Sequence, residues 1–220
     1  MKDQRTKQMV TMGMMAALAY IVMVFIRIPV VLFLKYEPKD VIITIGGFIY
    51  GPVAAFLISL IVSFVEMFTV SDTGWIGAAM NLISTCSFAC VAAAVYKKNH
   101  TLKGAVIGLV IGLISMVTVM MLWNYFLTPI YMGYPREAVA AMLPTAFLPF
   151  NLLKGGLNAA LTMLLYKPVV ITLRKAHLVP ASTGAKAGTG FKQISWGVVL
   201  VSAAVLITCI LLVLVISGKI

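Results

Sequence analysis

The 220-residue chain is 62% hydrophobic and only 10% charged, and its mean hydropathy is +1.06. Soluble domains carry roughly 25% charged residues, so the composition excludes an ordinary soluble protein and predicts one intramembrane bundle. The net charge of +11 does not indicate nucleic-acid binding, because the basic residues gather in short segments between apolar runs, as the positive-inside rule describes.

The apolar runs predict membrane helices in chain order. A first span over 9–26 is followed by a charged loop over 27–40. The run 41–65 is long enough for one span, but Gly51-Pro52 divides it, so one long helix and two short helices both fit. The remaining spans are expected over 75–96, 104–127 and 146–173, with a loop over 130–144 between the last two. The expected fold is all-α, a polytopic membrane helix bundle.

The Lys and Arg residues outside the spans do not choose between one helix and two over 41–65. In both arrangements eleven of them lie on one side of the membrane and five on the other. The two-helix arrangement makes the N-terminus and the 97–103 segment cytoplasmic, since basic residues concentrate on that side.

The C-terminal part of the chain differs in composition from the rest. Residues 176–193 are rich in Gly, Ser, Ala and Lys without apolar periodicity, which predicts a flexible cytoplasmic linker. Residues 194–220 predict an extra transmembrane helix that brings Lys219 to the outside. We therefore expect a membrane bundle over 1–175 that does not need the linker or the last helix to bind a ligand.

Three polar side chains inside the last span of the bundle are the most informative residues. Asn151, Lys154 and Asn158 recur at helical spacing, so they share one stripe of the helix. A charge near the membrane centre costs at least ~2.5–3.5 kcal/mol and is tolerated beside a cavity, a partner or a ligand. Lys154 therefore either snorkels to an interface or marks a polar ligand site within the membrane.

Other motifs indicate packing and not chemistry. Cys86, Cys90 and Cys209 lie in apolar runs without a nearby His or carboxylate, so we expect packed thiols and no metal site. The chain has no GxxxxGK[ST] phosphate loop and no paired carboxylates for acid–base catalysis, so we expect no enzyme and no catalytic cofactor. Small-residue faces that permit close helix contact, within the chain or with a partner, occur at Gly104, Gly108 and Gly112 and at Gly13, Ala16 and Ala17.

Four segments resemble the riboflavin-binding S-components of energy-coupling-factor (ECF) vitamin transporters. They are 33–55 (FLKYEPKDVIITIGGFIYGPVAA), 71–75 with Asn81, 123–131, and 149–159 (PFNLLKGGLNA). The resemblance covers roughly 9–175, and its most specific element is Asn151-x-x-Lys154 paired with Asn124. It implies a six-helix bundle with both ends cytoplasmic, two short helices over 41–65, and a pocket near the outer surface. The extra seventh helix is a departure from the family.

The resemblance also implies the ligand and its site. Asn124, Asn151 and Lys154 would bond the polar edge of the isoalloxazine ring of riboflavin or FMN. Aromatic side chains suit the flat apolar face of a flavin. The further candidate binding residues are Tyr36, Trp75, Asn81, Tyr125 and Asn158.

The function implied is the membrane substrate-binding subunit of an ATP-driven ECF importer in the bacterial plasma membrane. The face of Gly13, Ala16 and Ala17 would meet a membrane coupling subunit, and two separate cytoplasmic ATPases would hydrolyse ATP. Thiamine, biotin or pantothenate remain alternative ligands. An enzyme acting on lipid or prenyl substrates would need acidic pairs such as DxxxD, which are missing, and a scaffold without a ligand would leave Lys154 unexplained.

Overall fold

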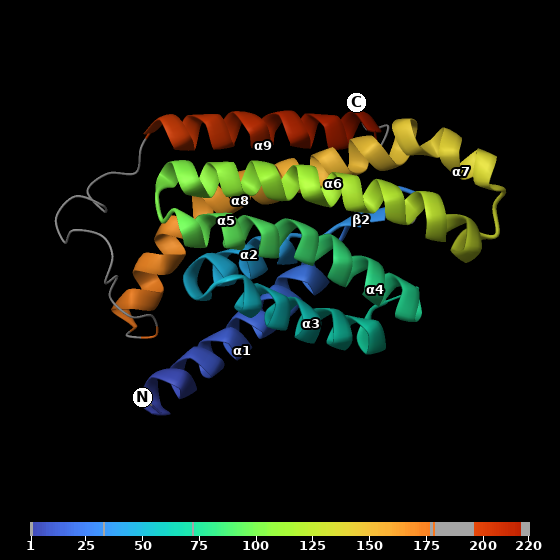
Figure 1. Cartoon of the computed structure of the whole chain (residues 1–220). Helices are drawn as coiled ribbons and strands as arrows, with labels where there is room; N and C mark the ends of the chain where they lie inside the picture. The colour runs from blue at the N-terminus through green and yellow to red at the C-terminus, as the bar shows by residue number, and fades with distance from the viewer. Residues whose placement is uncertain (1, 33, 72, 177, 179–195, 217–220) are drawn as a thin grey trace.

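The structure, a computed structural model, describes residues 2–32, 34–71, 73–176, 178 and 196–216. Nearly all of these residues are helical (Figure 1). Along the chain the elements are α1 (Lys2–Phe25), β1 (Ile28–Val31), β2 (Leu34–Tyr36), α2 (Lys39–Tyr50), α3 (Pro52–Thr69), α4 (Gly74–Thr85), α5 (Val91–Lys98), α6 (Leu102–Met132), α7 (Arg136–Met142), α8 (Leu148–Lys175) and α9 (Trp196–Ile216). Two π-helical turns, η1 (Cys86–Cys90) and η2 (Leu143–Phe147), join α4 to α5 and α7 to α8 without a break.

The helices confirm that the chain is a multi-pass membrane protein. In the described part, five helical segments are long and apolar enough to cross a bilayer. They are Gln4–Phe25, Pro52–Thr69, Gly74–Lys98, Leu102–Met132 and Arg136–Leu173. Their outward faces carry large apolar side chains, as contact with lipid requires.

Region 41–65 forms two helices that separate at Gly51. This residue has φ 96° and ψ 174°, a conformation that side-chain-bearing residues avoid, and its N–H donates to the carbonyl of Gly47 at 2.7 Å. Pro52 then occupies the first position of α3, where its missing N–H costs nothing. A helix of 12 residues is about 18 Å long, so α2 is shorter than the five segments that can cross the bilayer, and most of its residues are buried among the other helices.

The loop expected over 27–40 contains a β-hairpin, so the all-α expectation is wrong for this segment. Strands β1 and β2 pair antiparallel, with Ile28 opposite Tyr36. The strand Ile-Pro-Val-Val is rich in β-branched residues, which favour extended backbone over helix in a segment this short. The hairpin carries Leu34 and Tyr36 into the protein, where both are buried.

The loop expected over 130–144 is also largely helical. Helix α6 continues through Pro129 to Met132, and α7 begins only a few residues later. A proline removes one hydrogen bond of a helix, but packing in a membrane bundle can hold the helix together across it. Gly133, with φ 67°, ends α6 in the left-handed conformation that favours glycine.

The connections alternate between the two ends of the bundle. The N-terminus, the α5–α6 turn and the end of α8 lie at one end, on the left of Figure 1. The hairpin and the α6–α7 connection lie at the other end. We call this second end the hairpin end. The arrangement is the one that two helices over 41–65 require.

The two small-residue faces have different surroundings. A Cβ at Gly108 would lie 2.7 Å from the backbone oxygen of Ala92, so the glycine face of α6 is covered by α5 and η1 of the same chain. By contrast, a Cβ at Gly13 would meet nothing within 4 Å, and Ala17 is exposed. Ala16 is only 4% exposed and packs in the core, so it is not part of the outward face on which it was predicted.

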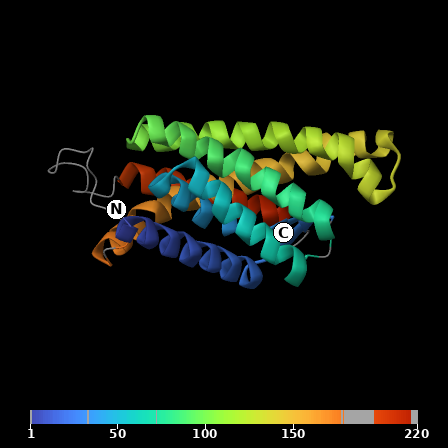
Figure 2. The ribbon, with the colours of Figure 1, turned by 60° about the horizontal axis from the view of Figure 1, so that its bottom comes forward.

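Helix α9 packs along α8 (Figures 1 and 2). Cys209 joins a buried cluster with residues of the hairpin and α8, and its Sγ lies 3.2 Å from the place of a Cβ on Gly156. The opposite face of α9, including Leu200 and Val201, is exposed. The helix predicted over 194–220 is therefore present over Trp196–Ile216, whereas most of the predicted linker and Lys219 lie outside the described residues.

Candidate functional site

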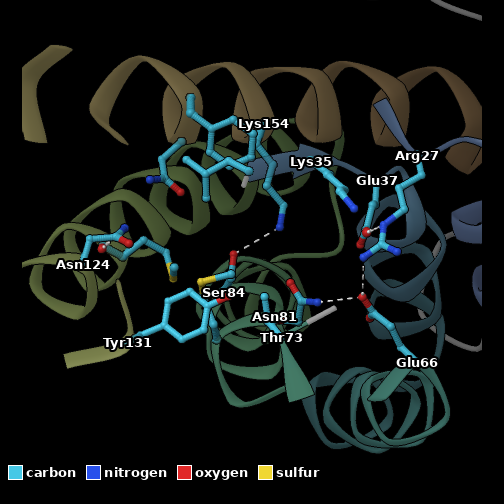
Figure 3. Close-up of a pocket in the computed structure, with 15 residues that line it drawn as sticks. Arg27, Lys35, Glu37, Glu66, Thr73, Asn81, Ser84, Asn124, Tyr131 and Lys154 are labelled. Atoms are coloured by element: carbon cyan, nitrogen blue, oxygen red, sulfur yellow. Dashed lines mark hydrogen bonds and ion pairs between the residues drawn. The ribbon is translucent and has the colours of Figure 1, made fainter. Parts of the chain in front are cut away.

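A cavity of about 260 Å³ opens at the hairpin end, between the hairpin and helices α3, α4, α6 and α8 (Figure 3). This volume lies just below the ~300–1,000 Å³ that small-molecule sites occupy. Its lining combines uncharged polar, charged and apolar side chains. The uncharged polar residues are Thr73, Asn81, Ser84, Asn124, Tyr131 and Asn151. The charged residues are Arg27, Lys35, Glu37, Glu66 and Lys154, and the apolar residues are Leu34, Met80, Met120 and Phe150.

Two buried amides on neighbouring helices face this cavity. Asn124 of α6 donates from Nδ2 to the carbonyl of Met120 at 2.7 Å, and its Oδ1 accepts from Thr128 at 2.9 Å. Asn151 of α8 donates from Nδ2 to the carbonyl of Phe147 at 2.8 Å. Each amide nitrogen carries two N–H groups. One of them anchors the side chain to its own helix, and the other is available to a ligand.

Lys154 does not snorkel to an interface. Its side chain is buried and reaches from α8 across to α4, where Nζ donates to Ser84 Oγ at 3.3 Å (Figure 3). Nζ also pairs with Asp40 Oδ2 at 3.3 Å. The ammonium group is therefore held at the cavity wall by a carboxylate that sequence analysis did not connect with it.

Asp40 is the centre of a buried polar network behind that wall. Its Oδ1 accepts from Thr85 at 2.6 Å, and its Oδ2 accepts from Asn158 Nδ2 at 3.1 Å. Tyr36 donates to Asn158 Oδ1 at 3.2 Å. Burial, followed by the nearby Asp40 carboxylate, raises the pKa of Tyr36, so its phenol stays protonated as this hydrogen bond requires. Tyr36 and Asn158, predicted as ligand contacts, support Asp40 and do not line the cavity.

Four charged side chains form a second network beside the cavity, in which only Arg27 is partly exposed. Lys39 pairs with Glu37 at 2.7 Å and with Glu66. Arg27 Nε pairs with Glu37 at 2.8 Å, and its Nη2 lies 3.8 Å from Glu66. Asn81 donates to Glu66 Oε1 at 2.8 Å. The two cations and two carboxylates balance, as buried charges must. We call Arg27, Glu37, Lys39 and Glu66 the four-charge cluster.

The four-charge cluster was missed because its residues are distant in the sequence: three of them lie in the charged loop predicted over 27–40, and Glu66 follows the apolar run 41–65. Lys39 is among the largest fully buried side chains of the described residues. The signal was a run of charges, Glu37-Pro38-Lys39-Asp40, directly before an apolar run. Charges at that place need partners when the following helix is buried.

Two predicted ligand contacts do not come to the cavity. Trp75 is 72% exposed and packs edge-on against Phe68, and Tyr125 is 38% exposed beside Phe126. Of the eight predicted residues, Asn81, Asn124, Asn151 and Lys154 line the cavity together. Its apolar surface comes instead from Leu34, Met80, Met120 and Phe150.

The cavity offers hydrogen bonds and apolar contact. In the described part of the chain, no group of three His, Cys, Asp or Glu side chains could hold a metal ion. Cys86 and Cys90 are free thiols in η1, and Cys209 is a free thiol in α9. The arrangement is suited to binding a small molecule that has both flat apolar surface and polar groups.

Comparison with known proteins agrees with this geometry. The family model described as ECF transporter, substrate-specific component matches residues 7–166. The riboflavin transporter RibU of Staphylococcus aureus (strain TCH60) is 29% identical over 182 residues, covering 78% of this chain and 95% of that protein. The riboflavin transporter FmnP of Bacillus subtilis (strain 168) is 26% identical over 190 residues, covering 79% and 99%.

A solved structure agrees as well. The chain of "Structure and mechanism of the S component of a bacterial ECF transporter" superposes with a TM-score of 0.65 at 28% identity, covering 77% of this chain and 99% of that chain. The family match ends at residue 166, before α9 begins at Trp196. Because the match spans well over half of the sequence, the chain belongs to the family of ECF transporter substrate-specific components.

Proposed function

We propose that this protein is the membrane substrate-binding subunit of an ATP-driven ECF importer and that it captures riboflavin in the cavity at the hairpin end. The observation that carries the proposal is the convergence of Asn124, Asn151 and Lys154, from two helices, on one partly apolar cavity. Two relatives that match over nearly their whole length are named riboflavin transporters, which supports the choice of ligand.

The cavity lining matches the chemistry of a flavin. The isoalloxazine ring has flat apolar faces, which Met80, Met120 and Phe150 can cover. Its pyrimidine edge presents two carbonyl oxygens and one unprotonated ring nitrogen, which accept hydrogen bonds from amide and ammonium donors, and one ring N–H, which donates to an amide oxygen. FMN carries the same ring, so it is the second ligand to test.

Removing one ligand-facing amide should weaken riboflavin binding. Asn151→Ala and Asn124→Ala should each cost ~1–3 kcal/mol of binding free energy, because a polar edge of the ligand is left without a partner. Titration of purified protein, followed by quenching of flavin fluorescence, measures this. Asn99→Ala is the matched control, since Asn99 is an exposed amide at the opposite end of the bundle.

The same titration separates the proposed ligand from its alternatives. Thiamine, biotin and pantothenate should not compete with riboflavin for the purified protein. A protein that binds one of them and ignores riboflavin would overturn the choice of ligand but leave the family assignment intact.

The proposed partners are a membrane coupling subunit and two cytoplasmic ATPases. The outward face of α1 suits the first of these, because the exposed Gly13 and Ala17 allow another helix to approach the backbone closely. Ala16 is excluded from this face by its burial against the core.

We further propose that the bundle up to Lys175 is a complete binding unit and that α9 is an addition to it. The match to the solved structure covers 99% of that chain but only 77% of this one. None of the described α9 residues lines the cavity. A chain that ends after Lys175 should keep its riboflavin affinity. It should melt at a lower temperature, because Cys209 and its neighbours no longer cover α8. A large loss of affinity, with the fold retained, would make α9 part of the site.

A further inference from the structure

We propose that Asp40 is a positioning residue that holds the Lys154 ammonium in the orientation that binds the ligand. The inference rests on the proposed function, since it concerns how the same cavity recognises a flavin. Asp40 is fully buried at the start of α2 and does not line the cavity, so it acts through Lys154 and not by touching the ligand.

The orientation of the Asp40 carboxylate is set by hydrogen bonds from two other helices. Thr85 of α4 donates to Oδ1 at 2.6 Å, and Asn158 of α8 donates to Oδ2 at 3.1 Å. Oδ2 is also the atom that pairs with Lys154 Nζ at 3.3 Å. A carboxylate with hydrogen bonds to both oxygens has a fixed orientation, so it can hold the end of a long, flexible side chain in one place.

Lys154 needs such a fixed point. A lysine ammonium is a compact charge on a four-carbon stem with three N–H donors that rotate freely. Asp40 and Ser84 take two of these donors, and the third remains for a ligand acceptor in the cavity that Lys154 lines. Without the carboxylate, a buried ammonium has no charge partner here and gains by moving away from the site.

A purely structural role makes a different prediction, because Asp40 also links α2 to α4 and α8. If Asp40 only supported the fold, its replacement would weaken binding equally whether or not Lys154 is present. If it positions Lys154, its replacement would matter only while Lys154 is there. A double-mutant cycle separates the two cases.

The cycle compares the parent, Asp40→Asn, Lys154→Gln and the double variant in riboflavin titrations. We expect Asp40→Asn to weaken binding about tenfold in the parent, and to change it by less than about twofold in the Lys154→Gln background. The melting temperature of each ligand-free protein is recorded in parallel. We expect the double variant to recover part of the stability lost by each single variant, since neither charge is left alone.

Thr44→Val is the matched control. Thr44 is a buried hydroxyl that donates to the backbone oxygen of Asp40 at 2.6 Å, so its loss disturbs the same segment without touching the carboxylate. Riboflavin affinity should be unchanged in this variant.

The outcomes are distinct. If the parent protein does not bind riboflavin, the proposed function itself is wrong. If the parent binds riboflavin and Asp40→Asn binds equally well, only the proposed role of Asp40 is wrong. The same holds if Asp40→Asn loses the same factor of affinity with and without Lys154. Loss confined to the background that contains Lys154 supports it.

Discussion

A Lys39→Met protein is expected to lose about 3–5 kcal/mol of folding stability, because the substitution leaves two buried carboxylates with Arg27 as their one remaining cation. Lys39 lies between Glu37 and Glu66, and its side chain is almost completely buried. Arg27 already pairs with Glu37 through Nε and lies 3.8 Å from Glu66 through Nη2, but its single positive charge cannot balance both carboxylates. The yield of monodisperse protein in detergent and its melting temperature measure the loss.

Lys98→Met is the control for Lys39→Met, because it deletes the same charge from an exposed position at the end of α5. Lys39→Met combined with Glu66→Gln should recover part of the stability, since one unpaired carboxylate is then neutral. A Lys39→Met protein that melts like the parent would show that the four-charge cluster does not hold the hairpin to α2 and α3.

The second large effect is expected for Gly112→Val in α6. A Cβ at this position would lie 2.6 Å from the backbone oxygen of Phe88, which sits in η1 and cannot rotate away as a side chain would. Forcing the helices apart costs about 1–3 kcal/mol or more, and the melting temperature should fall accordingly.

Gly13→Val tests whether the loss at Gly112 comes from the contact and not from valine itself. Gly13 is also a glycine inside a long helix, but the added atoms would meet nothing within 4 Å. Its melting temperature should remain close to that of the parent. If the melting temperature falls equally in the two variants, the fall comes from the helix propensity of valine and not from the close contact at Gly112.

The candidate site was only partly predictable for a physical reason. Asn151 and Lys154 stand out because a polar stripe in an apolar helix is visible along the sequence. Asp40 and Glu66 do not stand out, because carboxylates at the edges of apolar runs are ordinary, and only the three-dimensional arrangement shows that both are buried against cations. Trp75 was selected for its chemistry, but its position on α4 directs it away from the cavity.

The amino-acid sequence by itself determined that this protein is a membrane helix bundle, where its main apolar segments lie, and that the 149–159 segment resembles a flavin-binding motif. These are local properties, since hydropathy and helical spacing are set by neighbours along the chain. Only the tertiary structure decided that strands β1 and β2 pair as a hairpin beside a cavity and that Lys154 pairs with Asp40. Whether a charge is solvated, paired or free for a ligand depends on contacts between distant segments, and such contacts exist only once the helices have packed.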